Sequence, residues 1–487
     1  MLRICRELFD DWNGGDILYC HWKSNEHLNE GLEGTTDLDV LLSADDREKA
    51  ESSLHKLDFL HCKSQFGARY PGVQDWIGFD RDTGRLIHLH LHFEMVTGHK
   101  GMKEYSLPWA EEVLQTRIQD SASLVFVSDP TWELLTLYTR IGLKASPRQV
   151  RKARKNRYAL SEDVAREIQY LKKRFDAERL TAIVERYYGE SAGRMLQLMN
   201  EESASSKWFL SLVDTTEKAM RKDCRYSKCS VFFRKWYFIL YSRFLEYLKY
   251  HRGKEIILRK VPYSGKGLSV AFLGQDGSGK STVSKEITKW LSWKLDVKKY
   301  YLGNGEDFSC REKRGLERLK ENKSFIAKCR KGILSLGMFT KVARNGYKSA
   351  RRAVRYANQG GIAIYDRFPQ NKYPGIQDGP KIRSALLRDV QLFPIVRSYA
   401  RWSAGREERL IAKTLTYPPQ IVIKLMLPVE VSMLRKPGEN REMVSRKHDI
   451  IQDCHFSGSR EYVVDATQDY RQEIIQIKQI IWDNLPK

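Results

Sequence analysis

Residues 274–282 read G-Q-D-G-S-G-K-S-T, and this stretch decides the fold of the region around it. The spacing G-x-x-x-x-G-K-S is typical of a glycine-rich loop whose backbone N–H groups surround a chain of phosphates. Residues 268–273, L-S-V-A-F-L, precede the loop and indicate a buried strand, and residues 283–295 after it indicate a helix. This order directs N–H donors and the positive end of a helix dipole at one point. We therefore predict a polyphosphate-binding site.

The chemistry of the loop residues suggests their individual roles. Lys280 would reach the β- and γ-phosphates of ATP, and the hydroxyl of Ser281 would coordinate Mg²⁺. ATP and Mg²⁺ are therefore the expected cofactors. The predicted ATP-binding residues are Gly274, Gln275, Asp276, Gly277, Ser278, Gly279, Lys280, Ser281 and Thr282.

The length of the chain, 487 residues, is too great for a single hydrophobic core. We expect an α/β domain over residues 1–130, a basic helical domain and linker over 131–260, and the phosphate-loop domain with a parallel sheet over 261–487. No run of about 18 uncharged apolar residues exists, so we expect no membrane span. The eight cysteines are scattered without metal-ligand spacing, and the N-terminus does not read as a secretory signal. We therefore expect reduced thiols and a cytoplasmic location.

The net charge of +23 is unevenly distributed along the chain. Residues 1–140 carry −10, residues 141–260 carry +14, and residues 261–487 carry +19. Residues 311–355 alone contribute +12 in a helix-like stretch without proline. This basic run could cover nucleic acid or an anionic membrane surface, but solvated helix faces are the favoured interpretation because aromatic residues are sparse there.

Three segments after the loop fit the same site. Residues 361–367, G-I-A-I-Y-D-R, indicate a strand that ends in Asp366 and Arg367, and ligands bind at the carboxyl ends of strands in open α/β sheets. Residues 419–428 indicate a second buried strand. The arginine-rich and lysine-rich stretch 430–447 follows and could close over a transferring phosphoryl group as a cationic lid. Residues 462–466, Y-V-V-D-A, indicate a last short strand.

In this order, residues 265–487 resemble the thymidylate kinase family of P-loop nucleoside-monophosphate kinases. The resemblance implies a catalytic set of Lys280, Asp276, Asp366, Arg367, Arg441 and Arg446. By it, Asp276 would approach the acceptor, Asp366 would serve the metal with Ser281, and Arg367 would bind the acceptor phosphate. Arg441 or Arg446 would stabilise the transition state.

The sequence departs from that family in ways that leave the phosphate acceptor open. Phe368 is followed by P-Q-N-K-Y-P instead of the usual serine-containing segment, and the basic insertion before Gly360 is atypical. The expected partner is a small phosphate acceptor, with a nucleoside monophosphate as the first choice and a homodimer as a further expectation. The alternatives are a kinase of a sugar or lipid-linked saccharide, and a non-catalytic ATP-gated protein that binds nucleic acid or an anionic membrane.

The N-terminal region contains a second group of candidate ligands. Residues 35–42, T-T-D-L-D-V-L-L, place Asp37 and Asp39 on one face of a strand, where they could hold a divalent cation. Residues 15–100 thereby resemble the nucleotidyltransferase superfamily, although Lys23 stands where that family usually has glycine. The later strand reads I-H-L-H-L-H-F-E over 87–94, and we predict His90 as the third metal ligand.

Residues from 130 to about 250 indicate a helical region. The most aromatic helix predicted for the chain covers residues 231–250, V-F-F-R-K-W-Y-F-I-L-Y-S-R-F-L-E-Y-L-K-Y, whose five charges exclude a bilayer span. We interpret it as a buried docking helix, with an interfacial membrane helix as the alternative.

Overall fold

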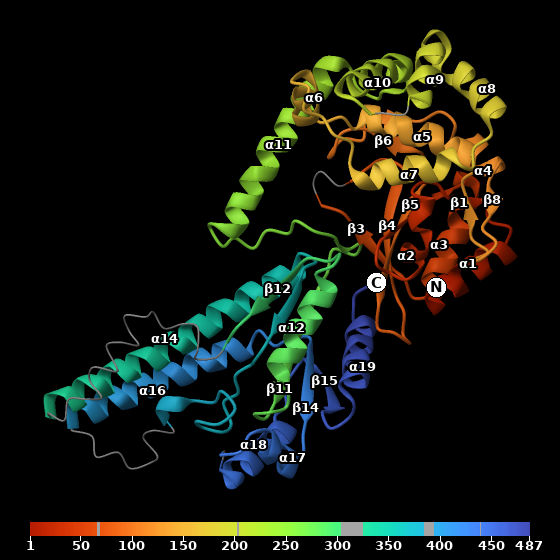
Figure 1. The fold of residues 1–487 in the computed structure, drawn as a ribbon. Helices are drawn as coiled ribbons and strands as arrows, with labels where there is room; N and C mark the ends of the chain where they lie inside the picture. The colour runs from red at the N-terminus through yellow and green to blue at the C-terminus, as the bar shows by residue number, and fades with distance from the viewer. Residues whose placement is uncertain (66–68, 202–203, 303–324, 384–393, 439) are drawn as a thin grey trace. The chain divides into compact units, whose positions relative to one another are not determined.

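The computed structural model describes residues 1–65, 69–201, 204–302, 325–383, 394–438 and 440–487. The chain divides into two compact units, Met1–Lys260 and Val261–Lys487, which we call the N-terminal and C-terminal units (Figure 1). Each combines helices with a sheet, so the predicted α/β class is confirmed. The finer division into domains 1–130, 131–260 and 261–487 stays a prediction.

The N-terminal unit begins with a mixed sheet. Its strands follow the order β3-β4-β5-β2-β1-β9-β8, in which β2 and β5 pair in parallel and β4 and β5 antiparallel. The strands are β1 (Tyr19–His21), β2 (Asp37–Leu42), β3 (Leu60–Lys63), β4 (Val73–Phe79), β5 (Leu86–His92), β8 (Ile118–Gln119) and β9 (Phe126–Val127), with a separate hairpin of β6 (Val96–Thr97) and β7 (Tyr105–Ser106). The accompanying helices are α1 (Arg3–Gly14), α2 (Leu28–Leu32), α3 (Arg47–Lys56) and α4 (Ala110–Gln115).

Apolar and polar side chains alternate along β2 and β5, and this pattern separates the apolar core from the polar face of the sheet. Leu38, Val40 and Leu89 belong to a buried cluster that also contains Trp12 of α1 and Leu54 of α3. Residues two apart on a strand point to the same face, so the intervening aspartates and histidines lie together on the other face.

A bundle of helices completes this unit. They are α5 (Pro130–Leu143), α6 (Pro147–Arg154), α7 (Glu162–Lys172), α8 (Ala177–Tyr188), α9 (Ala192–Asn200), α10 (Ser206–Ala219) and α11 (Lys228–Tyr250). The side chain of Asp129 accepts a hydrogen bond from the Thr131 backbone and so caps α5, with Pro130 at its first turn. Tyr138 and Trp208 pack edge to face in the core between α5 and α10.

Helix α11 differs from the interpretation drawn from its sequence. The helix forms, but none of its 23 residues is buried, so the expectation of a buried docking helix is wrong. The helix contacts the rest of the N-terminal unit through residues such as Lys235 and Phe238, and these residues are themselves only half-buried.

The C-terminal unit is built on a five-stranded parallel sheet of order β12-β13-β11-β14-β15. Its strands are β11 (Leu268–Gly274), β12 (Val297–Tyr300), β13 (Ile362–Tyr365), β14 (Ile421–Met426) and β15 (Arg460–Asp465), and a short β10 (Val261–Pro262) opens the unit. Its helices are α12 (Lys280–Leu291), α14 (Phe325–Asn358), α16 (Pro394–Leu415), α17 (Val429–Arg435), α18 (Arg441–Asp453) and α19 (Tyr470–Asp483). The strands predicted at 268–273, 361–367, 419–428 and 462–466 are thus confirmed, with small differences at their ends.

Helices α14 and α16 lie side by side and extend away from the sheet (Figure 1). The predicted basic stretch 311–355 falls partly on α14. Its residues 311–324 lie outside the described residues, and residues 325–355 are helical as expected.

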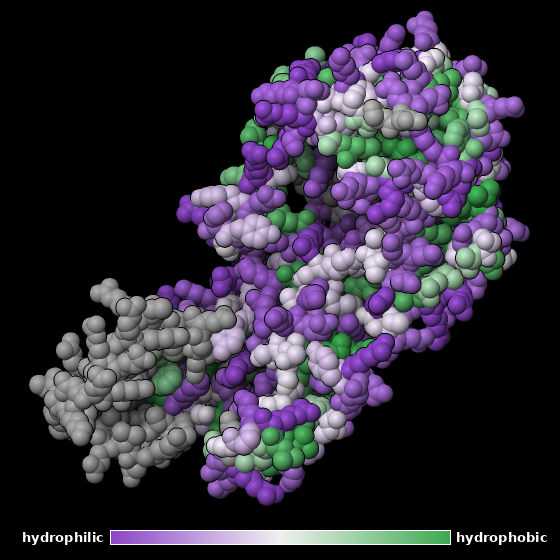
Figure 2. Space-filling model, viewed as in Figure 1, coloured by the Kyte–Doolittle hydropathy of each residue, from purple (hydrophilic) through white to green (hydrophobic). Residues whose placement is uncertain are grey.

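No helix within the described ranges is both long enough and apolar enough to cross a membrane. Hydrophilic residues dominate the visible face of the molecule in Figure 2, in line with the mean hydropathy of −0.53.

Candidate functional site

The glycine-rich loop joins β11 to α12, as the sequence predicts. Strand β11 is buried along its whole length, and α12 begins at Lys280. Gly277 and Gly279 have φ angles of +87° and +83°, a backbone conformation that side chains with a Cβ rarely adopt. The amine of Lys280 folds back over the loop and donates to the carbonyl oxygens of Gly274 at 2.6 Å and Gln275 at 2.8 Å.

Two features of the loop fit a polyphosphate. The Oγ atom of Ser278 is buried and has no hydrogen-bond partner among the described residues. A donor left in this state is costly unless a ligand satisfies it. Burial also lowers the pKa of Lys280 to about 8. An anion within the loop would raise that pKa again, because an opposite charge favours ionisation.

Asp366 lies directly after β13 and is almost fully buried. Its carboxylate accepts from Ser284 of α12 at 3.2 Å and pairs with Lys299 of β12, also at 3.2 Å. The hydroxyl of Ser281 lies in the first turn of α12 and is exposed. Carboxylate and hydroxyl oxygens are ligands that Mg²⁺ accepts, so the residues present fit the expected metal.

Arg367 extends from the same strand end towards Asp378, at 3.6 Å. The charges of Asp276, Asp366 and Asp378 all act on Arg367, and those of Asp276, Arg367 and Asp366 act on Lys280. The fold therefore brings four of the six predicted catalytic residues close enough for their charges to act on one another. They are Asp276, Lys280, Asp366 and Arg367.

The predicted lid is a pair of helices in the described residues, and Lys447 of α18 contacts the loop. This amine forms an ion pair with Asp276. Although burial disfavours the charge of Asp276, the Lys447 ammonium holds the pKa of that carboxyl below its usual value. From α17, Ser432 donates to the Asp276 carbonyl oxygen at 2.8 Å, and Arg435 donates to that of Gly277 at 3.3 Å.

The two lid arginines predicted to be catalytic, Arg441 and Arg446, both have exposed side chains. Arg441 pairs with Glu430 at 2.9 Å, and both side chains are largely exposed. Arg446 is exposed on α18. Their roles stay predictions. Lys299 and Ser284, which contact Asp366, were not predicted from the sequence, and neither belongs to a contiguous motif that could have indicated them.

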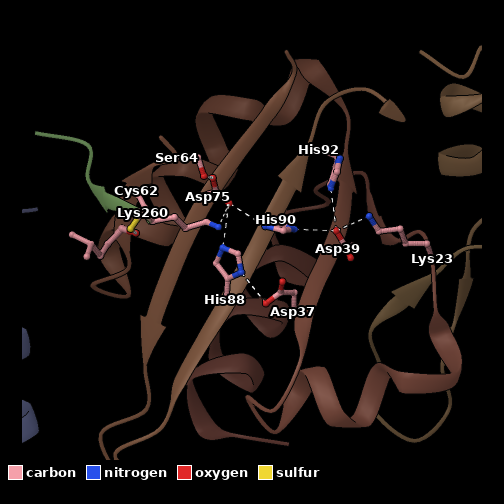
Figure 3. Close-up of polar contacts among 11 residues, drawn as sticks. Lys23, Asp37, Asp39, Cys62, Ser64, Asp75, His88, His90, His92 and Lys260 are labelled. Carbon is pink, nitrogen blue, oxygen red and sulfur yellow. Dashed lines mark hydrogen bonds and ion pairs between the residues drawn. The ribbon is translucent and has the colours of Figure 1, made fainter. Parts of the chain in front are cut away.

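The N-terminal unit forms a second cluster on the polar face of its sheet (Figure 3). The parallel register of β2 and β5 sets Asp37 opposite His88 and Asp39 opposite His90. Two groups could hold a metal ion: Asp37 with His88 and His90, and Asp39 with His90 and His92. The predicted ligands Asp37, Asp39 and His90 are therefore neighbours in space.

Asp75 on β4 is the carboxylate that the sequence analysis missed in this cluster. It lies opposite His90 in the antiparallel register, and the Nε2 atom of His90 is 3.1 Å from its carboxylate. The Nδ1 atom of the same ring is 3.2 Å from Asp39. Burial disfavours a charged imidazole, but these two carboxylates outweigh it and raise the pKa of His90 to about 9.

Lysines complete the cluster. Lys23 pairs with Asp39 at 2.8 Å, and Lys260 pairs with Asp75 at 3.5 Å. Against the opposing effect of burial, Lys23 holds the pKa of Asp39 well below its usual value. Three acids thus face two lysines and one protonated histidine, so a metal ion would have to compete with these cations.

The C-terminal unit is thus an α/β domain with a glycine-rich phosphate loop at the carboxyl end of the central strand of a parallel sheet. No family model matches the chain. It is 25% identical over 224 residues to the uncharacterized ATP-binding protein YghR of Escherichia coli strain K12, a match that covers 44% of this chain and 86% of YghR. YghS of the same strain, also an uncharacterized ATP-binding protein, is 24% identical over 210 residues, which are 40% of this chain and 85% of YghS.

Among solved structures, the chain is similar to deoxyadenosine kinase from M. mycoides with bound dATP. The identity is 18% with a TM-score of 0.27, and the match covers 44% of this chain and 98% of that one. The same enzyme with bound dCTP matches at 20% identity and a TM-score of 0.25, with the same coverage.

Proposed function

We propose that the C-terminal unit is an ATP-dependent phosphotransferase that acts on a nucleoside monophosphate or a similar small phosphorylated acceptor. The observation that carries the proposal is the loop itself, where Lys280 lies over the glycine turn and the buried Ser278 hydroxyl lacks a partner among the described residues. The 25% identity over 224 residues to YghR, a protein named as ATP-binding, supports it.

The reaction would transfer the γ-phosphoryl group of ATP in line. An acceptor oxygen forms a bond to the γ-phosphorus while the bond to the β–γ bridging oxygen breaks, ADP leaves and the acceptor oxygen loses any proton that it carries. Bound Mg²⁺ would supply charge neutralisation at the phosphates, held by Ser281 and Asp366. The chain's own contribution is position and positive charge, because phosphoryl transfer needs little covalent chemistry from the protein.

Lys280, Arg367 and Lys447 would supply most of that positive charge. Lys280 would contact the β- and γ-phosphates and Arg367 the acceptor phosphate, which a guanidinium can bind through two hydrogen bonds. Lys447 reaches Asp276 from the lid, so closure of α18 would bring its charge beside the transferring group.

A small cavity is lined in part by Asp378, the ion-pair partner of Arg367, and offers a place for the acceptor. It lies between the segment after β13 and helices α14 and α16. Its lining mixes apolar groups such as Phe339 with the charged side chains of Asp378, Lys381 and Glu407. Its volume of about 30 Å³ has room for one or two waters only, so α14 and α16 would have to separate to admit a nucleotide.

The test is a panel of acceptors assayed with γ-labelled ATP and Mg²⁺, comprising nucleoside monophosphates, free sugars and lipid-linked saccharides. We expect labelled product from a nucleoside monophosphate and no product from the Lys280→Ala variant. Lys285→Ala, an exposed lysine on the same helix, is the matched control. If only a saccharide were labelled, the acceptor would be a saccharide instead of a nucleoside monophosphate. If the Lys280→Ala variant turned over as fast as the wild type, the kinase proposal would be overturned.

We also propose that the N-terminal unit binds a divalent cation through Asp37, Asp39 and His90, with His88 or His92 as a further ligand. The two ligand groups that share His90 support this proposal. Imidazole ligands suit Zn²⁺ better than Mg²⁺. We expect nucleotidyl transfer by this unit to be weak or redirected, because Lys23 stands where the nucleotidyltransferase superfamily usually has glycine and pairs with Asp39.

A further inference from the structure

Helix α11 presents an unusual number of large apolar side chains to solvent. Eight of its 23 residues are between 49% and 74% exposed and are aromatic or leucine. They are Phe232, Phe233, Trp236, Tyr237, Leu240, Phe244, Tyr247 and Tyr250. Single exposed apolar residues are normal on a protein surface, but a contiguous group of this size marks an interaction site.

These eight residues share one face of the helix. At about 100° per residue they fall within an arc of about 140°. Every half-buried residue of α11 falls outside that arc. Two of them contact the rest of the N-terminal unit: the Lys235 amine lies 2.7 Å from Nε2 of His99, and the ring of Phe238 packs closely against Gly101. The outward arc, which we call the aromatic face, is thus set by the way the helix is anchored.

The charges of α11 indicate what the aromatic face binds. The helix carries five basic residues, Lys228, Arg234, Lys235, Arg243 and Lys249, and one acidic residue, Glu246. The exposed cation Arg243 lies within the aromatic face near one of its edges, and the exposed cation Arg234 lies about 60° beyond the other edge. Lysine and arginine around a face of tryptophan, tyrosine and phenylalanine are typical of a helix that lies in the plane of a membrane surface.

We propose that α11 binds an anionic lipid membrane through its aromatic face, beyond the phosphotransferase function of the C-terminal unit and independently of it. The aromatic rings would enter the headgroup region, and the flanking cations would pair with lipid phosphates. A second copy of this helix fits less well, since pairing the faces would bring like charges together. A single-stranded nucleic acid fits less well, because the aromatic face itself contains only Arg243 to follow a row of phosphates.

The test is co-sedimentation of the full chain with vesicles of phosphatidylcholine, alone or mixed with phosphatidylglycerol. We expect binding to the mixed vesicles, weaker binding as salt is raised, and little binding to phosphatidylcholine alone. The double variant Leu240→Glu/Phe244→Glu should lose at least about tenfold in affinity for the mixed vesicles. Both positions are exposed, so the variant should fold, and circular dichroism would verify this. Leu124→Glu, at an exposed leucine elsewhere in the N-terminal unit, is the matched control and should bind normally.

The proposal is overturned if the mixed vesicles do not sediment the chain, or if the α11 variant binds them as tightly as the Leu124→Glu control. Light scattering and an oligonucleotide titration separate the other occupants. If the wild-type chain is a dimer and the α11 variant is a monomer that binds vesicles as the wild type does, the aromatic face is assigned to a second copy of the chain. If the wild-type chain binds an oligonucleotide but no vesicles, and the α11 variant loses the oligonucleotide binding, the aromatic face is assigned to nucleic acid.

Discussion

At the scale of single residues, the candidate site divides into a part that the sequence predicts and a part that it does not. The nine residues of the loop are contiguous, so their spacing alone indicates a shared role, and in the structure Lys280 lies over the loop. Lys447 meets Asp276 from 171 residues away in the sequence. That contact depends on which face of α18 is directed at the loop. A stretch that contains several cations does not indicate which of those cations will lie on that face.

The pKa of Lys280 leads to a prediction for the pH dependence of ATP binding. Burial lowers this pKa to about 8 in the chain without nucleotide, and bound phosphates would raise it again. Below pH 8 the amine is already charged, so affinity should be nearly independent of pH. Above pH 8 a proton must be taken up on binding, and the affinity should fall by up to about tenfold per pH unit. Calorimetry in buffers of different ionisation enthalpy would measure that proton uptake, and an affinity that stays flat to pH 9.5 would contradict the assignment.

The lid leads to a second prediction. Lys447→Met should lower kcat/KM for phosphoryl transfer by about tenfold or more, because it removes a charge held beside the loop. Lys289→Met, at an exposed position on α12, is the control for a change of net charge. Equal kinetics in the two variants would mean that the ion pair with Asp276 only positions the lid.

At the scale of elements, the strands are predicted well because their apolar runs are short and strongly patterned. The two-residue period of β5 correctly indicates that its histidines share a face. The role of Asp75 is not visible in the sequence, since it follows from the register between β4 and β5 rather than from any spacing within one strand. Helix α11 shows the same limit, because an apolar face alone does not reveal whether the fold covers it.

The end of β13 allows a kinetic test of the acceptor site. Arg367→Ala should raise the KM of the acceptor or lower kcat/KM, since Arg367 would bind its phosphate. Asp366→Ala should instead weaken the dependence of the rate on Mg²⁺. Steady-state assays with acceptor and Mg²⁺ varied separately would distinguish the two effects. If neither variant altered the acceptor kinetics, the pair would be structural.

The strand pair β2 and β5 allows a test of the proposed metal site. In the full chain, Zn²⁺ or Mn²⁺ should raise the melting temperature of the N-terminal unit, and Asp37→Asn/Asp39→Asn should abolish that shift. Asp45→Asn/Glu48→Gln, at two exposed positions nearby, is the matched control. Calorimetry with Mg²⁺, Mn²⁺ and Zn²⁺ would show which ion binds. If none does, the ion pairs of Lys23 and Lys260 already complete the cluster.

At the scale of the whole molecule, each of the two units carries its own cluster of charged residues, and the sequence already separates the two clusters by motif. Residues 1–140, which carry a net charge of −10, contain the aspartates of β2 and β4. The basic remainder of the chain contains the loop, the lid and α11. Because the units are compact bodies with separate sites, a change in the metal cluster should leave phosphoryl transfer intact, and loop variants should leave metal binding intact.

The central claim is that the loop between β11 and α12 binds ATP with Mg²⁺, and the most direct measurement is calorimetric titration of the full chain with that nucleotide. We predict one site per chain, at least about tenfold weaker binding in Lys280→Ala, and unchanged binding in Lys285→Ala. Absence of binding to the wild-type chain, or equal affinity in wild type and Lys280→Ala, would contradict the claim.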